Sequence, residues 1–370
     1  MKQFLKNSFS FSTVCLLCIL ATLAASSCKK DDDPVKNPDT TGYLYKNGIF
    51  VINEGLFNQG SASLTFYSQD SGIAFHNVFS STNQRPLGDV GFSMMVTGDT
   101  GFIVVNNSGT IEVVDMHTMR SIKTISGLSS PRYICPVSNS KAYISSFYES
   151  EIYILNPVTL EITGTIPTGR TLEQMVRIND EVFAASWSQW MHPTINNNQI
   201  LVIHSITDAI TDSISVTKEP NSMVVDKNQH LWVLCSGGYN NEEMPSLIKI
   251  APQERTILMN MNFLSEWAYP SRLTINSSGD ELYYIDYPNI YNIDIQATSL
   301  PVMPFIDGNG KSFYSLSYDP DSHLLIASDA KDFQQPGTVY MYSPDGTETG
   351  HFEAGINPGF MLPFWIDKSE

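Results

Sequence analysis

Residues 221–262 read NSMVVDKNQHLWVLCSGGYNNEEMPSLIKIAPQERTILMNMN, and this stretch holds four short runs rich in Val, Ile, Leu and Met. The runs cover residues 221–226, 230–236, 246–251 and 255–262. Asn, Asp, Gly and Pro fill the connections, and no run carries a sustained helical period, so four consecutive β-strands are predicted. Four antiparallel strands with short connections are the unit from which one blade of a β-propeller is built.

The same unit recurs along the chain with a period of about 40–50 residues, which is the period of propeller blades. Prolines open the first strand of four units, at Pro131, Pro220, Pro270 and Pro358. Second strands are predicted at residues 101–106, 141–147, 181–187, 230–236, 281–286 and 323–329. Third strands are predicted at residues 111–115, 152–156, 200–204, 247–250, 290–294 and 339–343. Six complete blades follow from these runs.

The two ends of the repeat region are incomplete in complementary ways. Residues 48–53, 63–68 and 74–79 give three strands that lack a first strand, whereas residues 359–366 give a first strand without a blade. Pairing them in one sheet closes the ring and removes its free edges. The sequence therefore predicts an all-β fold, a seven-bladed β-propeller over residues 43–370 closed by a C-terminal strand that completes blade 1. A two-domain sandwich would not explain that lone strand.

The first 42 residues have the composition of a targeting segment and a linker. Residues 1–27 combine two lysines with an apolar run at 13–25, which is the pattern of a signal peptide. The small residues before Cys28 resemble the site where lipoproteins are cleaved and acylated, so lipidation of Cys28 is expected; ordinary cleavage near Ser27 is the alternative. Residues 28–42 predict a flexible acidic tether, and its KKDDD start resembles the export tag of Bacteroidota-type lipoproteins. We expect a lipid-anchored protein at the cell surface of an outer membrane.

Charge and motif content narrow the function. The chain carries 21 Lys and Arg against 38 Asp and Glu, a net charge of −17, so nucleic acid is an unexpected partner because a polyanion needs a basic footprint. Nucleophile-elbow, zinc-protease, zinc-cluster and phosphate-loop patterns are lacking, and we predict no catalytic residue, no metal site and no catalytic cofactor. The alternative is an enzyme with a metal held by the loop acids Glu54, Asp89, Glu149, Glu173, Asp286 and Asp329.

Function in a propeller is expected on the face where second strands connect to third strands and where each blade connects to the next. Aromatic and amide residues are frequent in these connections, and together they suit a sugar or a large amide-bearing ligand. The candidate ligand-binding residues are Asn53, Phe57, Asn107, Arg132, Tyr148, Trp187, Trp190, Tyr239, Trp267, Arg272, Tyr287 and Phe333. Any one aromatic residue could instead wedge two blades apart, and Arg132 or Arg272 could instead pair with an acid such as Glu149 or Asp286.

Several short motifs carry a family resemblance across nearly the whole repeat region. They are Asn53-Glu54-Gly55, LGDVG at 87–91, VNNSG at 105–109, SPRY at 130–133, EQMV at 173–176, KEPNS at 218–222 and LWVL at 231–234. With them the chain resembles the surface propeller lipoproteins of gut Bacteroidota with YncE-like repeats, and most closely those that bind cobalamin (vitamin B12).

That resemblance implies a corrinoid receptor with cobalamin as its bound ligand, and a TonB-dependent outer-membrane transporter as its partner. The residues themselves leave other classes open. A glycan-binding surface lipoprotein would use the same aromatic residues, whereas a propeller hydrolase or a quinoprotein-like dehydrogenase would need acids or histidines that converge at the central opening. A purely structural role is a further alternative, and it would leave the aromatic face without a pocket.

Overall fold

The computed structural model describes residues 45–187 and 197–365. In these residues nearly all regular secondary structure is β-strand. These residues belong to one compact unit, Tyr43–Glu370. The signal segment, Cys28, the tether and Trp190 lie outside the described residues, so the predictions made for them remain predictions. In the described part, no helix has both the length and the apolar character needed to cross a membrane.

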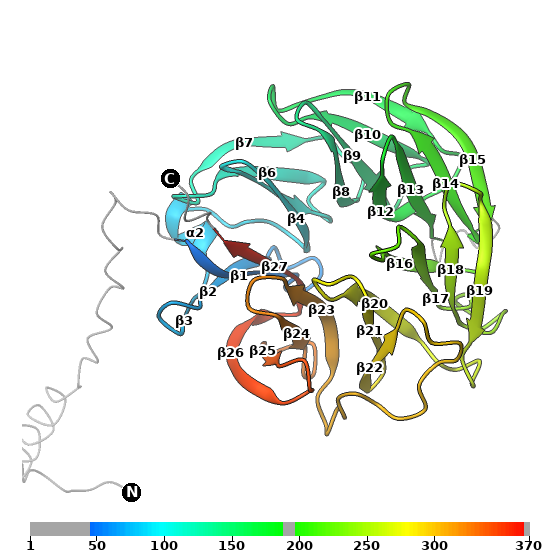
Figure 1. Ribbon diagram of the computed structural model, residues 1–370. Helices are drawn as coiled ribbons and strands as arrows, with labels where there is room; N and C mark the ends of the chain where they lie inside the picture. Colours follow the sequence, from blue (N-terminus) through cyan, green and yellow to red (C-terminus); the bar gives the residue numbers. More distant parts are fainter. Residues whose placement is uncertain (1–44, 188–196, 366–370) are drawn as a thin grey trace, which may run out of the picture. The chain divides into compact units, whose positions relative to one another are not determined.

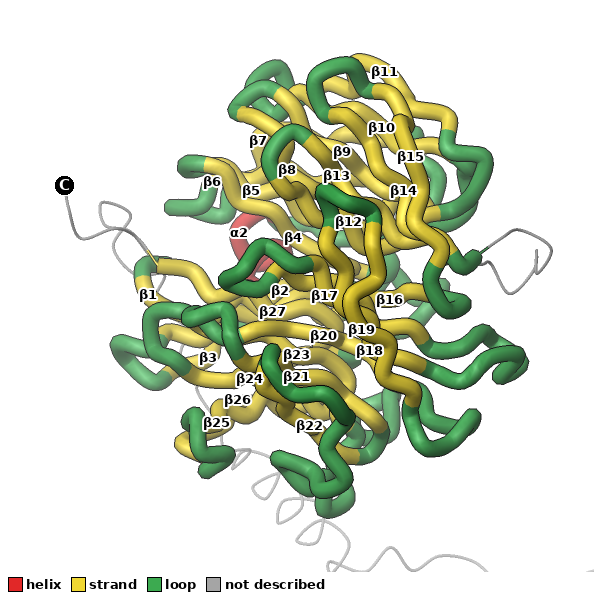
Figure 2. The backbone as a smooth tube through the Cα atoms, turned by 45° about the vertical axis from the view of Figure 1, so that its right-hand side comes forward, coloured by secondary structure: helices red, strands yellow, loops and turns green. Residues whose placement is uncertain are grey.

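The described strands form seven sheets arranged in a ring, which confirms the predicted seven-bladed propeller (Figure 1). Blade 1 contains β27 (Pro358–Trp365), β1 (Asn47–Asn53), β2 (Ser63–Ser68) and β3 (Ile73–Phe75); blade 2 contains β4 (Gly91–Thr97), β5 (Thr100–Val105), β6 (Thr110–Asp115) and β7 (Ser121–Ser126). Blade 3 contains β8 (Pro131–Ser138), β9 (Lys141–Ser146), β10 (Glu151–Asn156) and β11 (Glu161–Pro167); blade 4 contains β12 (Leu172–Ile178), β13 (Glu181–Ser186), β14 (Gln199–His204) and β15 (Ala209–Ser215). Blade 5 contains β16 (Pro220–Val225), β17 (Leu231–Cys235), β18 (Ser246–Ala251) and β19 (Thr256–Asn262); blade 6 contains β20 (Pro270–Ile275), β21 (Glu281–Asp286) and β22 (Asn289–Asp294); blade 7 contains β23 (Phe313–Asp319), β24 (Leu324–Asp329), β25 (Pro336–Tyr342) and β26 (Glu348–Ile356). Figure 2 shows the loops gathered at the ends of these strands.

The ring closes as predicted, because β27 pairs antiparallel with β1 from Asn47 opposite Trp365 to Asn53 opposite Pro358. Asn53 is fully buried at this closure. Its Nδ2 donates to the hydroxyls of Ser63 and Thr65, at 3.1 Å each, and its Oδ1 accepts from the backbone N–H of Gly355 at 2.9 Å. The structure therefore places this predicted ligand residue inside the fold, where it joins blade 7 to blade 1.

The sixth blade differs from the predicted four-strand unit, since the described residues give it only three strands. Residues 299–307 follow β22 where a fourth strand would lie, but they make only an isolated bridge between Ile306 and Ile290. Pro301 and Pro304 explain the difference, because proline has no N–H to donate to a strand ladder.

The segment predicted as a strand at 74–79 also differs. The strand β3 ends at Phe75, and a short helix, α2 (Val78–Asn83), begins after Asn77, whose φ of 53° is left-handed and ends the extended backbone. Val78 and Phe79 are buried, so the helix covers part of blade 1 with its apolar residues.

The buried side chains form seven clusters in the described residues, one between each pair of neighbouring blades. Between blades 2 and 3, for example, Phe102 packs in one cluster with Ile144. Such a side chain contributes roughly 1.5–3 kcal/mol when it is fully buried, and the array is held together by contacts between neighbours. Cys135 and Cys235 are buried and free, and burial raises the pKa of the Cys135 thiol to about 12.

Candidate functional site

The exposed aromatic residues identify one face of the ring. Antiparallel strands place the connections between second and third strands, and those between blades, on the same face; we call it the aromatic face. Among the described residues, every exposed aromatic side chain lies in one of these connections, with exposures from 44% for Phe333 to 76% for Trp267. The seven are Phe57, Tyr148, Tyr239, Trp267, Tyr269, Tyr287 and Phe333. Exposed aromatic side chains gathered on one side make that face the candidate interaction site.

A β-bulge near the start of every innermost strand shapes the centre of this face. In blade 2, Gly91 and Ser93 have partners on β5 while Phe92 between them has none, and in blade 3 the register shifts across Arg132 and Tyr133. Corresponding shifts occur at Glu173–Gln174, Asn221, Arg272–Leu273, Tyr314 and Gly359 in the other five blades. A bulge turns a side chain out of the regular alternation of a strand, so the seven bulges together direct these residues to the central opening.

Side chains of neighbouring blades hold the backbone of the bulged strands. The Ser93 hydroxyl of blade 2 donates to the carbonyl of Arg132 in blade 3 at 2.6 Å, and the Ser222 hydroxyl of blade 5 accepts from the N–H of Leu273 in blade 6 at 3.0 Å. The Asn221 amide also donates to the Pro270 carbonyl at 2.8 Å. The first two bonds use backbone groups of bulged residues, and all three join adjacent blades and fix their relative position.

The bulged residues of blades 2–7 line a cavity of about 460 Å³ at the ring centre. Five predicted ligand residues contribute to it, namely Arg132, Trp187, Arg272, Tyr287 and Phe333. The cavity is also lined by Phe92, Tyr133, Glu173, Gln174, Asn221, Ser222, Tyr269, Ser271, Leu273, Ile285, Phe313, Tyr314, Ser315, Leu316 and Phe360. Its volume falls in the range of roughly 300–1,000 Å³ that is typical of small-molecule sites.

Arg132 is neutralised within the cavity wall. Its Nε donates to both carboxylate oxygens of Glu173, at 3.0 and 3.1 Å, and its Nη2 donates to Oε1 at 2.6 Å. The guanidinium carbon lies 3.6 Å from the centre of the Phe92 ring and 4.8 Å from that of Phe147. Burial lowers the pKa of Arg132, but the charge of Glu173 and its hydrogen bonds, together with smaller contributions from Tyr133 and Glu54, raise it overall. Arg132 therefore pairs with Glu173, the second residue of β12 in the next blade, and not with Glu149.

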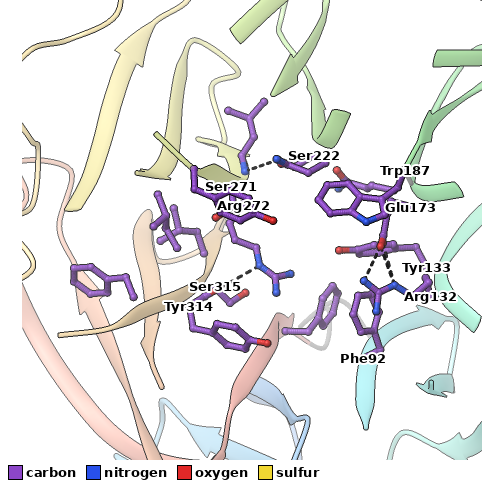
Figure 3. A pocket seen from close by; sticks show the side chains of 18 of the residues that line it. Phe92, Arg132, Tyr133, Glu173, Trp187, Ser222, Ser271, Arg272, Tyr314 and Ser315 are labelled. Atoms are coloured by element: carbon purple, nitrogen blue, oxygen red, sulfur yellow. Dashed lines mark hydrogen bonds and ion pairs between the residues drawn. The ribbon is translucent and has the colours of Figure 1, made fainter. Parts of the chain in front are cut away.

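Arg272 has a different environment, although its side chain also points into the opening (Figure 3). Its Nε donates to the backbone carbonyl of Tyr314 at 3.1 Å, and its guanidinium carbon lies 5.4 Å from the centre of the Tyr314 ring. No described carboxylate lies within 4.0 Å of its charged nitrogens. Asp286, one of the acids that the sequence offered as an alternative partner for the two arginines, instead accepts from the N–H of Tyr269 at 3.3 Å.

A second carboxyl group lies beside the cavity. The Tyr314 hydroxyl donates to Oε1 of Glu54 at 2.8 Å. Gly359 leaves the space for this carboxyl group, because a Cβ atom at that position would collide with the Glu54 side chain. Burial raises the pKa of Glu54, and the charge of Arg272 and the hydrogen bond from Tyr314 lower it by less. The bulged residue of blade 1, Gly359, has no side chain. Blade 1 instead contributes the carboxyl group of Glu54, which lies in a loop of the same blade.

The other predicted ligand residues lie outside the cavity lining. Phe57, Tyr148, Tyr239 and Trp267 are exposed on the aromatic face around it. Asn107 lies on the same face, where its amide donates to Asp89 at 2.5 Å and to Asn58 at 3.1 Å. In the described residues, no group of three or more His, Cys, Asp and Glu side chains could hold a metal ion.

Sequence reasoning did not place Phe92, Tyr133, Glu173 and Tyr314 among the ligand-binding residues. Their shared signal is positional, since each lies one or two residues after the start of an innermost strand. A comparison of the seven repeats at that position would have found them without the structure.

The fold and the site define a seven-bladed β-propeller with a polar and aromatic cavity at its centre. A family described as a domain of unknown function (DUF5074) matches residues 47–351, and the chain belongs to this family. None of the curated proteins matches it.

Solved structures share the fold. A quinoprotein alcohol dehydrogenase-like protein from Bacteroides thetaiotaomicron has a TM-score of 0.66 at 14% identity, with 86% of this chain and 78% of that chain covered. A protein from Lactobacillus plantarum has a TM-score of 0.64 at 10% identity over 86% of this chain and 99% of its own. A functionally unknown protein from Desulfotomaculum acetoxidans has a TM-score of 0.62 at 13% identity over 87% of this chain and 100% of its own. At these identities the likeness concerns the fold alone.

Proposed function

We propose that this chain is a ligand-binding propeller whose aromatic face captures a small molecule, and that the ligand is a corrinoid such as cobalamin. The observation that carries the proposal is the confinement of the exposed aromatic side chains to one face, where Tyr269, Tyr287 and Phe333 also line the central cavity. Flat aromatic rings around a cavity that is mainly apolar but also carries polar side chains suit a ligand with a broad apolar face and polar edges. A corrin ring with its amide side chains has this character.

The size of the cavity fits partial entry of such a ligand. A corrinoid exceeds a drug-sized molecule, so a cavity of about 460 Å³ accepts one part of it while the rest lies on the aromatic face. Gln174 and Asn221 line the cavity and supply amides that donate and accept hydrogen bonds. The family resemblance of the motifs supports the same ligand, together with a lipid anchor at Cys28, a cell-surface location and delivery to a TonB-dependent transporter.

Binding without catalysis is part of the proposal. Glu173 accepts three hydrogen bonds from Arg132, and Glu54 accepts one from Tyr314. Because both carboxyl groups are engaged with the protein, they are poorly placed to act as a general base toward a ligand.

Calorimetric titration of the purified chain with cyanocobalamin, beside a panel of plant and host glycans, tests the proposal. We expect tight one-to-one binding of the corrinoid and a loss of about tenfold or more in affinity for Tyr287→Ala or Phe333→Ala, because each ring buries apolar area against the ligand. Val158→Ala is the matched control, since Val158 is 71% exposed on the β10–β11 turn of the opposite face. Heat from glycans with none from cyanocobalamin would move the function to glycan capture.

A further inference from the structure

The conformation of Arg272 is set by the fold. The residue lies in the β20 bulge with a φ of 61°, a left-handed value that non-glycine residues rarely adopt and that costs about 1–3 kcal/mol. One hydrogen bond from Nε to the Tyr314 carbonyl holds the guanidinium, and the two terminal amino groups extend beyond it into the cavity. The surrounding structure thus keeps a strained residue in place, with two donors directed at the space a ligand would occupy.

The charges around the cavity act on Arg272 from a distance. Burial lowers the pKa of Arg272, but Tyr133, Tyr314, Glu54 and Glu173 together raise it. Glu173 is bound to Arg132 at 2.6 Å, and the Glu54 carboxyl group is hydrogen-bonded to Tyr314. Among the described residues, neither of these carboxyl groups nor any other lies within 4.0 Å of the charged nitrogens of Arg272, whose acceptor is the Tyr314 carbonyl. In a partly buried cavity the field of the Arg272 charge is screened less than at an open surface.

Among the described residues, the two terminal amino groups of Arg272 have no hydrogen-bond acceptor, and a guanidinium in this state has a defined chemical preference. Its planar fork binds the two oxygens of a carboxylate or phosphate through parallel charge-assisted hydrogen bonds. Around it, Tyr287 and Phe333 offer aromatic surface at the exposed edge of the same cavity. The combination fits an organic anion that has a large apolar body and one acidic group.

We propose that Arg272 is an anion-binding residue that selects ligands carrying a phosphate or carboxylate group. This inference rests on the proposed function, because it assigns an anion-binding role to a residue of the same cavity. For a corrinoid, the acidic group is the phosphodiester that links the nucleotide to the corrin ring, and the ring lies on the aromatic face. Corrinoids that lack this group bind more weakly for that reason.

The test compares cyanocobalamin with dicyanocobinamide, which lacks the phosphodiester and its nucleotide, by calorimetry on the purified chain. We expect the wild-type protein to prefer cyanocobalamin by about tenfold or more. Arg272→Gln should abolish this preference by lowering the affinity for cyanocobalamin about tenfold more than the affinity for dicyanocobinamide, whereas Arg272→Lys should keep part of the preference. Arg177→Gln is the matched control, because Arg177 lies on β12 outside the cavity lining and its side chain is 41% exposed.

Salt gives a measurement that needs no variant. Raising NaCl from about 50 to about 500 mM should weaken the binding of cyanocobalamin more than that of dicyanocobinamide, because only the former has the ionic contact. An equal loss of both corrinoids in Arg272→Gln, or an unchanged preference, would overturn the inference, since the arginine would then support packing and not an anion.

A corrinoid-independent probe separates the two proposals. Phenyl phosphate and benzyl alcohol share an aromatic ring but differ in charge, and their binding can be followed by saturation-transfer NMR. If neither corrinoid binds while the wild-type chain binds phenyl phosphate and Arg272→Gln does not, the corrinoid function fails and the anion site stands. If no corrinoid and no phenyl phosphate binds, both proposals fall.

Discussion

Removing the negative charge of Glu173 should destabilise the whole propeller. In the variant Glu173→Gln, Arg132 keeps its position because its guanidinium lies between the rings of Phe92 and Phe147, at 3.6 and 4.8 Å from their centres. It then lacks a counter-ion, since the structure gives it no other described ion pair. The side chain of Glu173 is 5% exposed and that of Arg132 is 20% exposed, so water replaces the lost contacts only in part.

The expected loss follows from this partial burial. Removing one partner of a buried ion pair costs about 3–5 kcal/mol. The cavity gives Arg132 some access to water, and glutamine keeps one carbonyl oxygen as an acceptor, so we expect a decrease of about 2–3 kcal/mol in the free energy of unfolding.

Equilibrium unfolding in urea, followed by circular dichroism, measures this loss. Asp180→Asn is the matched control, because it removes the charge of an exposed ion pair. Oδ1 of Asp180 lies 3.9 Å from Nη2 of Arg177, and the two side chains are 64% and 41% exposed. An exposed pair of this kind should contribute less than about 1 kcal/mol. A coincident transition by fluorescence would support the use of a two-state free energy.

The double variant Arg132→Met/Glu173→Gln completes a thermodynamic cycle. Because it removes the charge that the single variant leaves without a partner, it should lose less stability than the sum of the two single variants. The reasoning would be refuted if Glu173→Gln lost no more than Asp180→Asn, or if the two single effects were additive.

Two further outcomes follow from residues near the ring closure. Burial raises the pKa of Glu54 in the folded protein above the ordinary value of 4.5. At a pH between the unfolded-state pKa and the folded-state pKa, the folded state therefore binds more protons than the unfolded state. The stabilisation is therefore present below the unfolded pKa and is lost as pH rises through the folded pKa, and the unfolding free energy of wild type relative to Glu54→Gln should fall with rising pH; a rising difference would contradict the sign. Asn53→Ala should lower the free energy of unfolding by about 1–3 kcal/mol, because the N–H of Gly355 and the hydroxyls of Ser63 and Thr65 lose their partner. Calorimetric affinity for cyanocobalamin should stay unchanged in that variant, and a specific loss of affinity would instead return Asn53 to the ligand site.

The blade pattern was within reach of the sequence because a strand is a local feature. The second strand predicted at 281–286 is β21, Glu281–Asp286, and the lone strand predicted at the C-terminus is β27, which closes blade 1. Once the order of strands in a blade is known, the face on which each connection lies is also determined. Tyr287 and Phe333 could therefore be placed on the functional face without coordinates.

The strands predicted from the sequence differ from the structure at the outer edges of blades 1 and 6. The fourth strand of blade 6 is replaced by a segment with Pro301 and Pro304, and the outer segment of blade 1 ends early at Phe75. The outermost strand of a blade pairs with a neighbouring strand along one edge only. Its formation therefore depends less on burial and more on the hydrogen bonds that each of its residues can form.

The charge arrangement of the cavity was decided by the tertiary structure. Arg132 and Glu173 are 41 residues apart, and Tyr314 and Glu54 are 260 residues apart. Each pair joins different blades, and a bulge sets the direction of the side chains that meet. Periodicity along one chain determines which segments become strands and on which face their loops lie. Contacts across the closed ring decide which arginine forms an ion pair and which, among the described residues, has a backbone carbonyl as its acceptor, because those distances exist only after the blades have packed.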